Sequence, residues 1–376
     1  MGIYISGSGL FTPPEAISNQ ELVDCYNRYA AAHSAAGVAA GASDDASGSV
    51  MSNVEFIVKA SGIHSRHVVD KQGILDPQIM RPRLRLRSPD EPSIQCEMAT
   101  AAARQAMQRA GKQPADIDAV IVACSNLQRP YPAIAIEVQQ ALGITGFAFD
   151  MNVACSSATF GIQLAADTIG RDHARAVLVV SPEICSGHLN FRDRDSHFIF
   201  GDACTALVIE AGRTLTVPTA FEILGSRLQT SFSNNIRNDF GFLSRTETPP
   251  LPEERRLFRQ QGRKVFKEVI PLVNELILGH LDELGLSADD IRRLWLHQAN
   301  LNMNQLIAKR VLGRTPGEQE APIILDRYAN TSSAGSIIAF HLHHADLAVG
   351  DTGVICSFGA GYSAGSVVVR KSAKAI

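Results

Sequence analysis

A cysteine followed by two serines stands at a predicted turn from a strand into a helix, a position that can make a nucleophile. The apolar run 147–153 predicts a buried strand, and apolar residues at helical spacing from Phe160 onward predict a helix. Cys155 lies between them, where the free N–H groups and the positive end of a helix favour thiolate over thiol. Free cysteine is also among the most buried residue types, so the alternative interpretation is a cysteine that only fills the core.

Three further stretches could supply the polar partners that a thiolate nucleophile requires. His297 ends a predicted strand, and α/β folds place their ligands at strand ends. Asn330 lies in a turn of small polar residues before a predicted helix, where it serves either as the helix N-cap or as a fixed amide donor. The glycine turn 357–362 lies between two predicted strands and is either a plain hairpin or an oxyanion hole built from backbone N–H groups.

The order Cys155, His297, Asn330 fits two classes of enzyme. One is a papain-like cysteine hydrolase, in which the histidine and asparagine also follow far downstream. The local Cys-Gly-Ser-Cys-Trp signature of those hydrolases is missing, and Cys155 opens an apolar helix within a repeated strand–helix pattern. The other class is a thiol-dependent acyltransferase, and the spacing alone leaves both classes open.

The elements that must hold these residues alternate between strands and helices, which indicates an α/β fold. Two pairs of stretches correspond between the first and second parts of the chain: 119–125 with 294–297, and 201–210 with 361–370. We therefore expect two related α/β halves packed as layered helices and sheets. The halves are residues 1–211, which carry Cys155, and residues 212–376, which carry His297 and Asn330.

Composition and charge argue against several other classes of protein. A formal net charge of −3 gives no basic field for nucleic acid, and no apolar stretch is long enough to span a membrane. The seven cysteines form no Cys-x-x-Cys pair, which indicates reduced thiols and a cytoplasmic location. His341, His343 and His344 lack a carboxylate at useful spacing, and no glycine-rich phosphate loop follows a strand. We therefore expect neither a metal nor a bound cofactor.

Five stretches, taken together and in order, resemble the thiolase superfamily and specifically β-ketoacyl-acyl-carrier-protein synthase III. They are Val153-Ala-Cys-Ser-Ser157, Phe200-Gly-Asp202, His297-Gln-Ala-Asn-Leu301, Asn330-Thr-Ser-Ser-Ala-Gly335 and Ser357-Phe-Gly-Ala-Gly361. Each stretch alone is a weak signal, whereas the ordered set is specific and covers nearly the whole chain. The resemblance implies a thiolase-like fold for the two expected halves.

The resemblance also implies a mechanism. Cys155 would take the acyl group from an acyl-CoA, and malonyl-acyl carrier protein would then lose CO₂ and attack that acyl group in a Claisen condensation. His297 and Asn330 would bind the enolate, and the backbone N–H groups of Cys155 and Ala360 would bind the oxyanion. This makes the chain a 3-oxoacyl-acyl-carrier-protein synthase III that initiates fatty acid synthesis, with acyl carrier protein as its partner. A thioester hydrolase and a non-condensing acyl-CoA-binding protein on the same scaffold are the alternatives.

Matching positions suggest further binding residues. Phe56 would lie near the CoA adenine, Asn300 near the pantetheine, and Phe160 in the wall of the acyl pocket. Lys309 and Arg310 would lie on the docking face for the acidic carrier protein. Tyr131 aligns with a residue that reaches across a homodimer to close the neighbouring acyl pocket.

The chain also departs from the better-known members of the family. It has Ala60 and Asn302 where they carry arginines in the CoA and docking regions. Contacts to the CoA phosphates must then come from elsewhere, and Arg66 and the arginine run 81–87 are the candidates.

Three further stretches stand out along the chain. Residues 30–50 and 70–92 look like insertions near the tunnel mouth, and residues 252–284 read as a basic amphipathic helix. The insertions argue against acetyl-CoA as the best primer. The chain looks closest to a branch of the family that accepts medium-chain acyl-CoA, so we favour a medium-chain primer.

Overall fold

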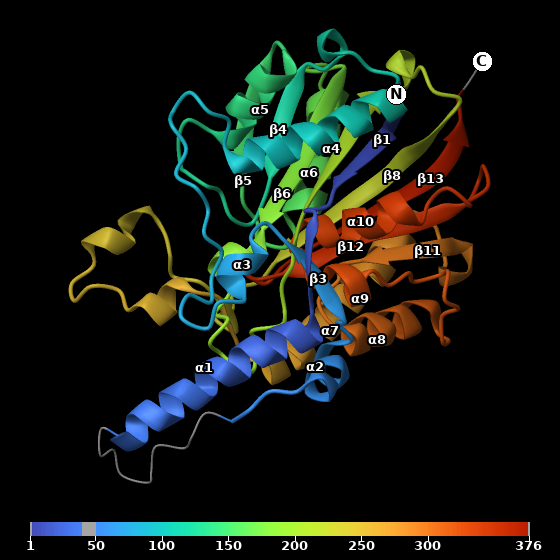
Figure 1. Cartoon of the computed structure of the whole chain (residues 1–376). Helices are drawn as coiled ribbons and strands as arrows, with labels where there is room; N and C mark the ends of the chain where they lie inside the picture. Colours follow the sequence, from blue (N-terminus) through green and yellow to red (C-terminus); the bar gives the residue numbers. More distant parts are fainter. Residues whose placement is uncertain (1, 40–49, 375–376) are drawn as a thin grey trace.

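A computed structural model of the chain describes residues 2–39 and 50–374, whose longest strands form one mixed sheet of nine strands. The order across this sheet is β11-β12-β13-β8-β1-β7-β6-β4-β5 (Figure 1). The nine strands are β1 (Ile3–Phe11), β4 (Ala119–Ala123), β5 (Phe147–Met151), β6 (Ala176–Ile184), β7 (Asp202–Ala211), β8 (Thr219–Thr230), β11 (Ile291–Leu296), β12 (Thr352–Gly359) and β13 (Ser363–Ala373). Two small ribbons pair β2 (Glu15–Ser18) with β3 (Ser65–Val68), and β9 (Ile236–Arg237) with β10 (Arg259–Gln260).

The helices begin and end at residues that favour those positions. Ser93 caps the start of α4 by accepting a hydrogen bond from the Cys96 N–H, and Gly111 ends that helix in the left-handed conformation. The helices are α1 (Asn19–Ala39), α2 (Val54–Ser61), α3 (Lys71–Ile74), α4 (Ile94–Ala110), α5 (Ile134–Leu142), α6 (Ser157–Gly170), α7 (Gly262–Glu283), α8 (Leu301–Leu312), α9 (Leu325–Tyr328) and α10 (Ala334–Leu342). Within the described ranges, no helix combines the length and apolar character needed to cross a bilayer.

The sheet consists of two parts with the same strand pattern. In the first part β1, β7, β6 and β4 follow one another, and in the second β8, β13, β12 and β11 do. In both parts the first two neighbouring pairs are antiparallel and the last pair is parallel. The strands β4 and β11, and likewise β7 and β13, thus take equivalent places, as the two correspondences in the sequence suggested. The division of the chain at residue 211 stays a prediction.

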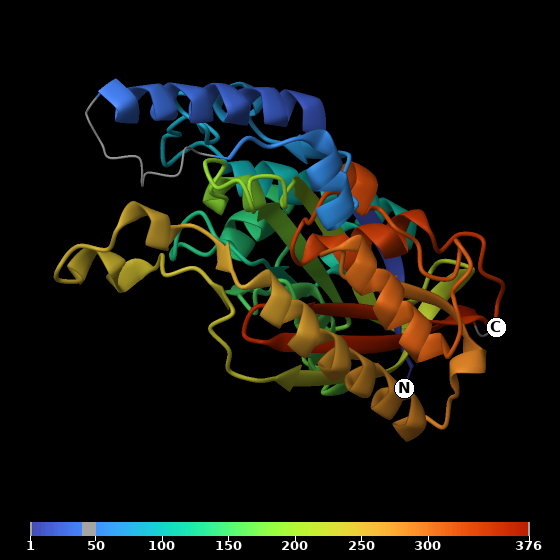
Figure 2. The ribbon, with the colours of Figure 1, turned by 90° about the horizontal axis from the view of Figure 1, so that it is seen from below.

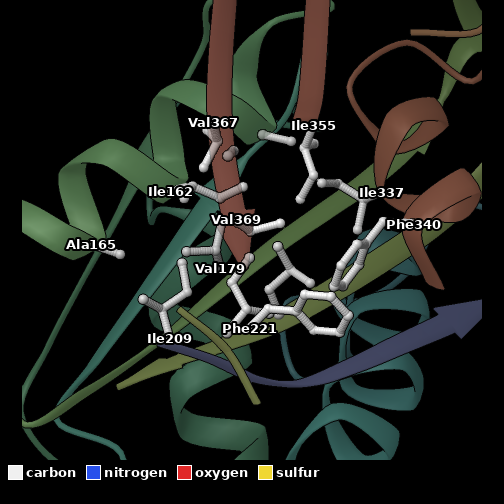
Figure 3. Close-up of a cluster of buried hydrophobic side chains, with 14 of the residues drawn as sticks. Ile162, Ala165, Val179, Ile209, Phe221, Ile337, Phe340, Ile355, Val367 and Val369 are labelled. Carbon is white, nitrogen blue, oxygen red and sulfur yellow. The ribbon is translucent and has the colours of Figure 1, made fainter. Parts of the chain in front are cut away.

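Alternate residues of the strands face different layers of helices. In β4, Ile121 faces an apolar cluster that contains α6 and α10, whereas Val120 and Val122 face α4 and α5 on the other side. In β12, Ile355 faces the same α6–α10 cluster, and Val354 faces α7 and α8. The helices α6 and α10 are therefore buried between the two parts of the sheet, with α4 and α5 outside one part and α7 and α8 outside the other (Figures 1 and 3).

Two expected elements differ in the structure. The strand at 147–153 forms, but as β5 it lies at the edge of the sheet, where Phe147 is 42% exposed. The helix expected from residue 252 begins only at Gly262. The preceding residues are held elsewhere because Arg237, Arg255 and Arg259 all pair with the carboxylate of Asp239. Residues 231–258 accordingly form an arm that projects from the body, seen in yellow in Figures 1 and 2.

The two insertions are only partly described. Helix α1 carries the first one as far as Ala39, and residues 40–49 lie outside the described residues. The second, 70–92, contains α3 and then runs without regular structure. Residues of this second insertion contact the loop near residue 192, because Arg192 donates to the carbonyl groups of Gln78 and Ile79.

Candidate active site

A cavity of about 460 Å³ contains Cys155, His297 and Asn330 in its lining. These residues come from the start of α6, from the end of β11 and from the turn before α10. The remaining wall is mostly apolar and includes Phe198, Phe200, Phe258, Phe266, Met303 and Phe358. The fold therefore brings together three residues that lie far apart in the sequence, in a pocket that excludes much of the solvent.

The turn that carries the cysteine is held in an unusual backbone conformation. Ala154 has a φ of +47°, which non-glycine residues rarely adopt. Its N–H donates to Asn152 Oδ1 at 2.8 Å, and its carbonyl accepts from Ser157 Oγ at 2.7 Å. These bonds hold Cys155 directly before Ser156, the N-cap of α6, as the sequence predicted.

The glycine turn packs against the cysteine. A Cβ added to Gly359 would lie 2.5 Å from Cys155 Cβ and 2.9 Å from its Sγ, so only glycine allows this approach. The two turns are also joined by Ser156 Oγ, which donates to the Ser363 carbonyl at 2.9 Å. The backbone of Ala360 is consequently held close to the thiol.

The thiol itself differs from the expectation based on the helix end. Burial raises the pKa of the Cys155 thiol to about 11, and the charge of Glu183 contributes in the same direction. Hydrogen bonds from Ser332 and from the backbone at Ala360 and Cys155 lower the pKa, but by less than burial raises it. The prediction that thiolate is favoured at Cys155 was therefore wrong, and the cysteine rests as a neutral thiol.

His297 is buried and neutral. Its backbone N–H donates to the Cys356 carbonyl at 2.7 Å. The Phe358 ring packs edge-on against the imidazole, with 5.1 Å between the two ring centres. Burial lowers the pKa of His297 to about 4 and outweighs an opposing backbone hydrogen bond at Ser332. At neutral pH the imidazole thus offers one N–H donor without a charge.

Asn330 is held through both its backbone and its side chain. Its N–H donates to the Ile199 carbonyl at 3.0 Å, and its own carbonyl accepts from Gly201 N–H at 3.1 Å. Its Oδ1 accepts from Ser332 N–H at 2.8 Å, while Nδ2 has no protein partner in the part of the chain that the structure describes. Since Ser333 and not Asn330 is the N-cap of α10, the structure supports an amide donor over an N-cap.

The expected binding residues are divided between the cavity and the surface. Asn300 lines the cavity beside Ala60 and Asn302. Phe56 lies near the cavity, where its ring contacts Phe198 at 5.8 Å. Lys309 and Arg310 are exposed at the end of α8, away from the lining residues.

Two other expected pocket residues lie outside this cavity. Phe160 is half-buried one turn along α6, and the cavity meets α6 only at its start. Tyr131 is 73% exposed in the loop before α5. Their roles toward the acyl chain stay predictions, because neither side chain contributes to the wall around Cys155.

Arg66 cannot contact a CoA phosphate. It is fully buried and donates to the carbonyls of Ile17 and Phe198 and to Asn19 Oδ1. Burial lowers the pKa of its guanidinium to about 9. This burial could not be predicted, because in the sequence Arg66 is indistinguishable from an arginine on the surface.

The arginine run 81–87 is also a poor phosphate site. Arg85 pairs with Glu91 at 2.6 Å, and Arg87 pairs with Glu97 at 2.7 Å. None of the cavity-lining residues comes from this run.

Two arginines other than these phosphate candidates lie nearer to the cavity. The guanidinium of Arg194 lies 4.0 Å from the centre of the Phe56 ring, and exposed Arg263 lines the cavity. The pairing of Phe56 with an arginine 138 positions away has no local sequence signal. Within residues 2–39 and 50–374, no three His, Cys, Asp or Glu side chains are grouped to hold a metal.

Comparison with known proteins gives consistent matches. The family model described as 3-oxoacyl-[acyl-carrier-protein] synthase III matches residues 149–231, and the model for its C-terminal part matches residues 281–371. The chain is similar to a Pseudomonas aeruginosa protein named β-ketodecanoyl-[acyl-carrier-protein] synthase, with 62% identity over 85% of this chain and 91% of that one. It is 33% identical to a Brucella anthropi protein named β-ketoacyl-[acyl-carrier-protein] synthase III, over 87% and 93% of the two chains.

Solved structures show the same fold. The 3-oxoacyl-[acyl-carrier-protein] synthase III of Aquifex aeolicus superposes with a TM-score of 0.76 at 23% identity, over 98% of this chain and all of that one. The priming β-ketosynthase of the R1128 polyketide pathway superposes with a TM-score of 0.78 at 23% identity, over 99% and 97% of the chains. The expected thiolase-like α/β fold is thereby confirmed.

The neutral state of the thiol leads to a testable pH dependence. The rate of alkylation of Cys155 by iodoacetamide should rise with pH and reach half its maximum near pH 11. Only the thiolate reacts, and burial raises the pKa of Cys155 to about 11. Mass spectrometry of the Cys155 peptide gives the rate at each pH, and a short cysteine peptide with a midpoint of about 8.5 is the control. A midpoint for Cys155 at or below that of the peptide would contradict the assignment.

Proposed function

The chain belongs to the 3-oxoacyl-[acyl-carrier-protein] synthase III family, and on that basis we propose that Cys155, His297 and Asn330 catalyse its condensation. As a member it is an acyl-transferring, condensing enzyme of fatty acid biosynthesis. The observation that carries the proposal is that these three side chains line one apolar cavity. The relatives are named as synthases, so neither the thioester hydrolase nor the non-condensing binding protein is favoured.

In the first step Cys155 takes the acyl group from an acyl-CoA. A bond forms between Cys155 Sγ and the acyl carbon, the bond to the CoA sulfur breaks, and the thiol proton goes to the departing CoA. The negative charge that develops on the carbonyl oxygen would be bound by the N–H groups of Cys155 and Ala360, which already contact the thiol region. The raised pKa of Cys155 means that this proton transfer accompanies the attack.

In the second step the malonyl group of malonyl-acyl carrier protein occupies the cavity. Neutral His297 and the Asn330 amide donate to its thioester carbonyl, so that the electron pair left by departing CO₂ is held as an enolate. The enolate carbon attacks the acyl carbon, the Sγ–carbon bond breaks, and Cys155 regains a proton from solvent. The products are 3-oxoacyl-acyl carrier protein, CO₂ and free CoA, and no metal or prosthetic group is required.

The preferred primer in this proposal is octanoyl-CoA. The Pseudomonas relative, at 62% identity, is named for a β-ketodecanoyl product. Because malonyl contributes two carbons after decarboxylation, a ten-carbon product requires an eight-carbon primer. The aromatic and aliphatic wall of the cavity is compatible with such a chain.

Half-buried Arg194 and exposed Lys309 and Arg310 supply the outer ligand contacts in this proposal. Phe56 and Arg194 present an aromatic ring and a guanidinium near the cavity, which suits an adenine and its phosphates. Exposed Lys309 and Arg310 present positive charge to an acidic carrier protein. The seven cysteines are all free thiols, which supports a reducing, cytoplasmic location for this reaction.

We also propose that the enzyme is a homodimer formed along β5. This strand lies at the sheet edge with one unpaired side, and Phe147 on it is 42% exposed. Tyr131 and Ile136, in the neighbouring loop and α5, are 73% and 48% exposed. A second copy would cover these apolar side chains and would bring its own Tyr131 toward this chain.

Mass spectrometry after incubation with acyl-CoAs tests the first step. Octanoyl-CoA should give an acyl adduct at least about tenfold faster than acetyl-CoA, since burial of only two of its extra methylenes, at roughly 0.8 kcal/mol each, already supplies that factor. The adduct should disappear in Cys155→Ala, whereas Cys96→Ala, which removes a buried thiol outside the cavity lining, should keep it. No adduct with acyl-CoAs of any length would refute the proposal.

Asn330→Ala separates the two steps. It should retain acylation of Cys155 but lower the condensation rate by about 100- to 1,000-fold, because one donor to the enolate is removed. Single-turnover acylation and release of 3-oxoacyl product from malonyl-acyl carrier protein are the two measurements. Equal loss of both steps in a folded variant would show that Asn330 does not act at the enolate.

Light scattering tests the dimer. We expect about twice the 40.5 kDa of one chain, and a shift toward one chain in Phe147→Asp, which places charge on the β5 edge. Val349→Asp is the control, since Val349 is 56% exposed in the turn before β12, far along the sheet from β5. A wild-type mass of one chain at micromolar protein would rule the dimer out.

A further inference from the structure

Glu183, near the end of β6, is a fully buried carboxylate. It accepts hydrogen bonds from Ser125 N–H at 3.0 Å and Ser125 Oγ at 2.5 Å, and from the N–H and hydroxyl groups of Ser333. No lysine, arginine or histidine in the described ranges forms an ion pair with it. The two serines supply four donors, and Cys185 Sγ donates as a fifth at 3.8 Å. Burying a carboxylate without a cation is nevertheless costly, so a role for this group has to be sought.

The two hydrogen bonds from Ser125 connect Glu183 with the turn that carries the nucleophile. The Ser125 carbonyl accepts from Asn152 Nδ2 at 2.8 Å, and Asn152 Oδ1 accepts from the Ala154 N–H at 2.8 Å. Ala154 is the residue with φ of +47°, directly before Cys155. Glu183 therefore supports, through Ser125 and Asn152, the strained turn that aims the thiol.

The two hydrogen bonds from Ser333 connect Glu183 with the turn that carries Asn330. Ser333 is the N-cap of α10 and lies in the same turn as Asn330, whose Oδ1 accepts from Ser332 N–H. Ser332 itself has a φ of +50°, a second strained position. The same carboxylate thus joins the turns that carry the groups for the first and the second step.

The charge of Glu183 also reaches the thiol. Its ionisable neighbours are the thiols of Cys124, Cys155, Cys185 and Cys204 and the carboxyl of Asp202, and its charge raises the pKa of each. His297, which lines the cavity together with Asp195 and Arg263, is neutral because burial lowers its pKa to about 4. No cation among the named neighbours of Glu183 offsets the negative charge beside Cys155.

We propose that Glu183 is a positioning residue that joins the Cys155 turn to the Asn330 turn and that places a carboxylate next to the nucleophile's turn. The inference rests on the proposed function, because it takes the roles of Cys155 and Asn330 from there. A neutral thiol reacts slowly with oxidants and stray electrophiles. The carboxylate therefore protects the cysteine in the resting site.

The test variant is Glu183→Gln, which keeps the shape and removes the charge. The midpoint of the Cys155 alkylation profile should move to lower pH, with a rate at pH 8 about tenfold above wild type, as for a one-unit fall in pKa. Condensation should fall at least about tenfold, because the amide cannot accept all four hydrogen bonds. An unchanged alkylation midpoint in folded Glu183→Gln would overturn the electrostatic part.

Three further variants separate charge from position. Ser333→Ala loosens the Asn330 turn and keeps the charge, so condensation should fall while the midpoint stays. Asp202→Asn removes another fully buried carboxylate, which lies on the adjacent strand β7 and accepts hydrogen bonds from Ser186 and Val69. This change should leave the midpoint of Cys155 alkylation unchanged. Glu183→Asp keeps a charge but shortens the side chain, so it tests positioning if Glu183→Gln does not fold. Undiminished condensation in both Glu183→Asp and Ser333→Ala would overturn the positioning role.

Alkylation does not depend on any substrate, so the two proposals fail differently. Wild-type enzyme that acyl-CoAs do not acylate refutes the proposed function while the alkylation profiles are still readable. If the wild-type enzyme is acylated and condenses, and the Glu183 variants behave in the same way, only the inference about Glu183 is refuted.

Discussion

The burial of α6 and α10 in one apolar cluster is the constraint on which the candidate site depends. Ile162 and Ala165 of α6 and Ile337 and Phe340 of α10 pack between the two parts of the sheet (Figure 3). Each large aliphatic or aromatic side chain buried in this way contributes about 1.5–3 kcal/mol. Because both helices are fixed by this packing, the turns that lead into them are fixed too, and these turns carry Cys155 and Asn330. The chemistry is thus located by the core and refined by hydrogen bonds.

Burial also sets the electrical character of the site. It raises the pKa of the Cys155 thiol and lowers that of His297, so both groups are neutral at physiological pH. Cysteine hydrolases instead activate their nucleophile with an adjacent imidazolium and a depressed thiol pKa. A neutral histidine and an amide are suited to donate hydrogen bonds to an oxygen that gains charge only during the reaction. The electrostatics therefore agree with a condensing enzyme better than with a hydrolase.

The sequence made the chemical groups predictable because each stands where a predicted strand or helix ends. Cys155, His297 and the Gly359 turn all follow apolar strand runs, and the order of the motifs identified the fold. Burial around individual charges could not be predicted. Arg66 is enclosed by carbonyls from distant segments, and Glu183 is bound by serines that lie 58 and 150 positions away. The pKa of the Cys155 thiol likewise depends on burial by the surrounding chain. Such effects arise only when separate segments meet.

The close approach of Gly359 to Cys155 determines how a covalent inhibitor must reach this enzyme. The backbone of Gly359 closes one side of the sulfur, since even a methyl group there would lie 2.9 Å from it. An electrophile therefore has to enter along the cavity and past its aromatic wall. Because the resting thiol is neutral, a strongly reactive warhead gains little selectivity at this cysteine. Affinity for the channel, with a mild warhead placed at its inner end, is the productive design.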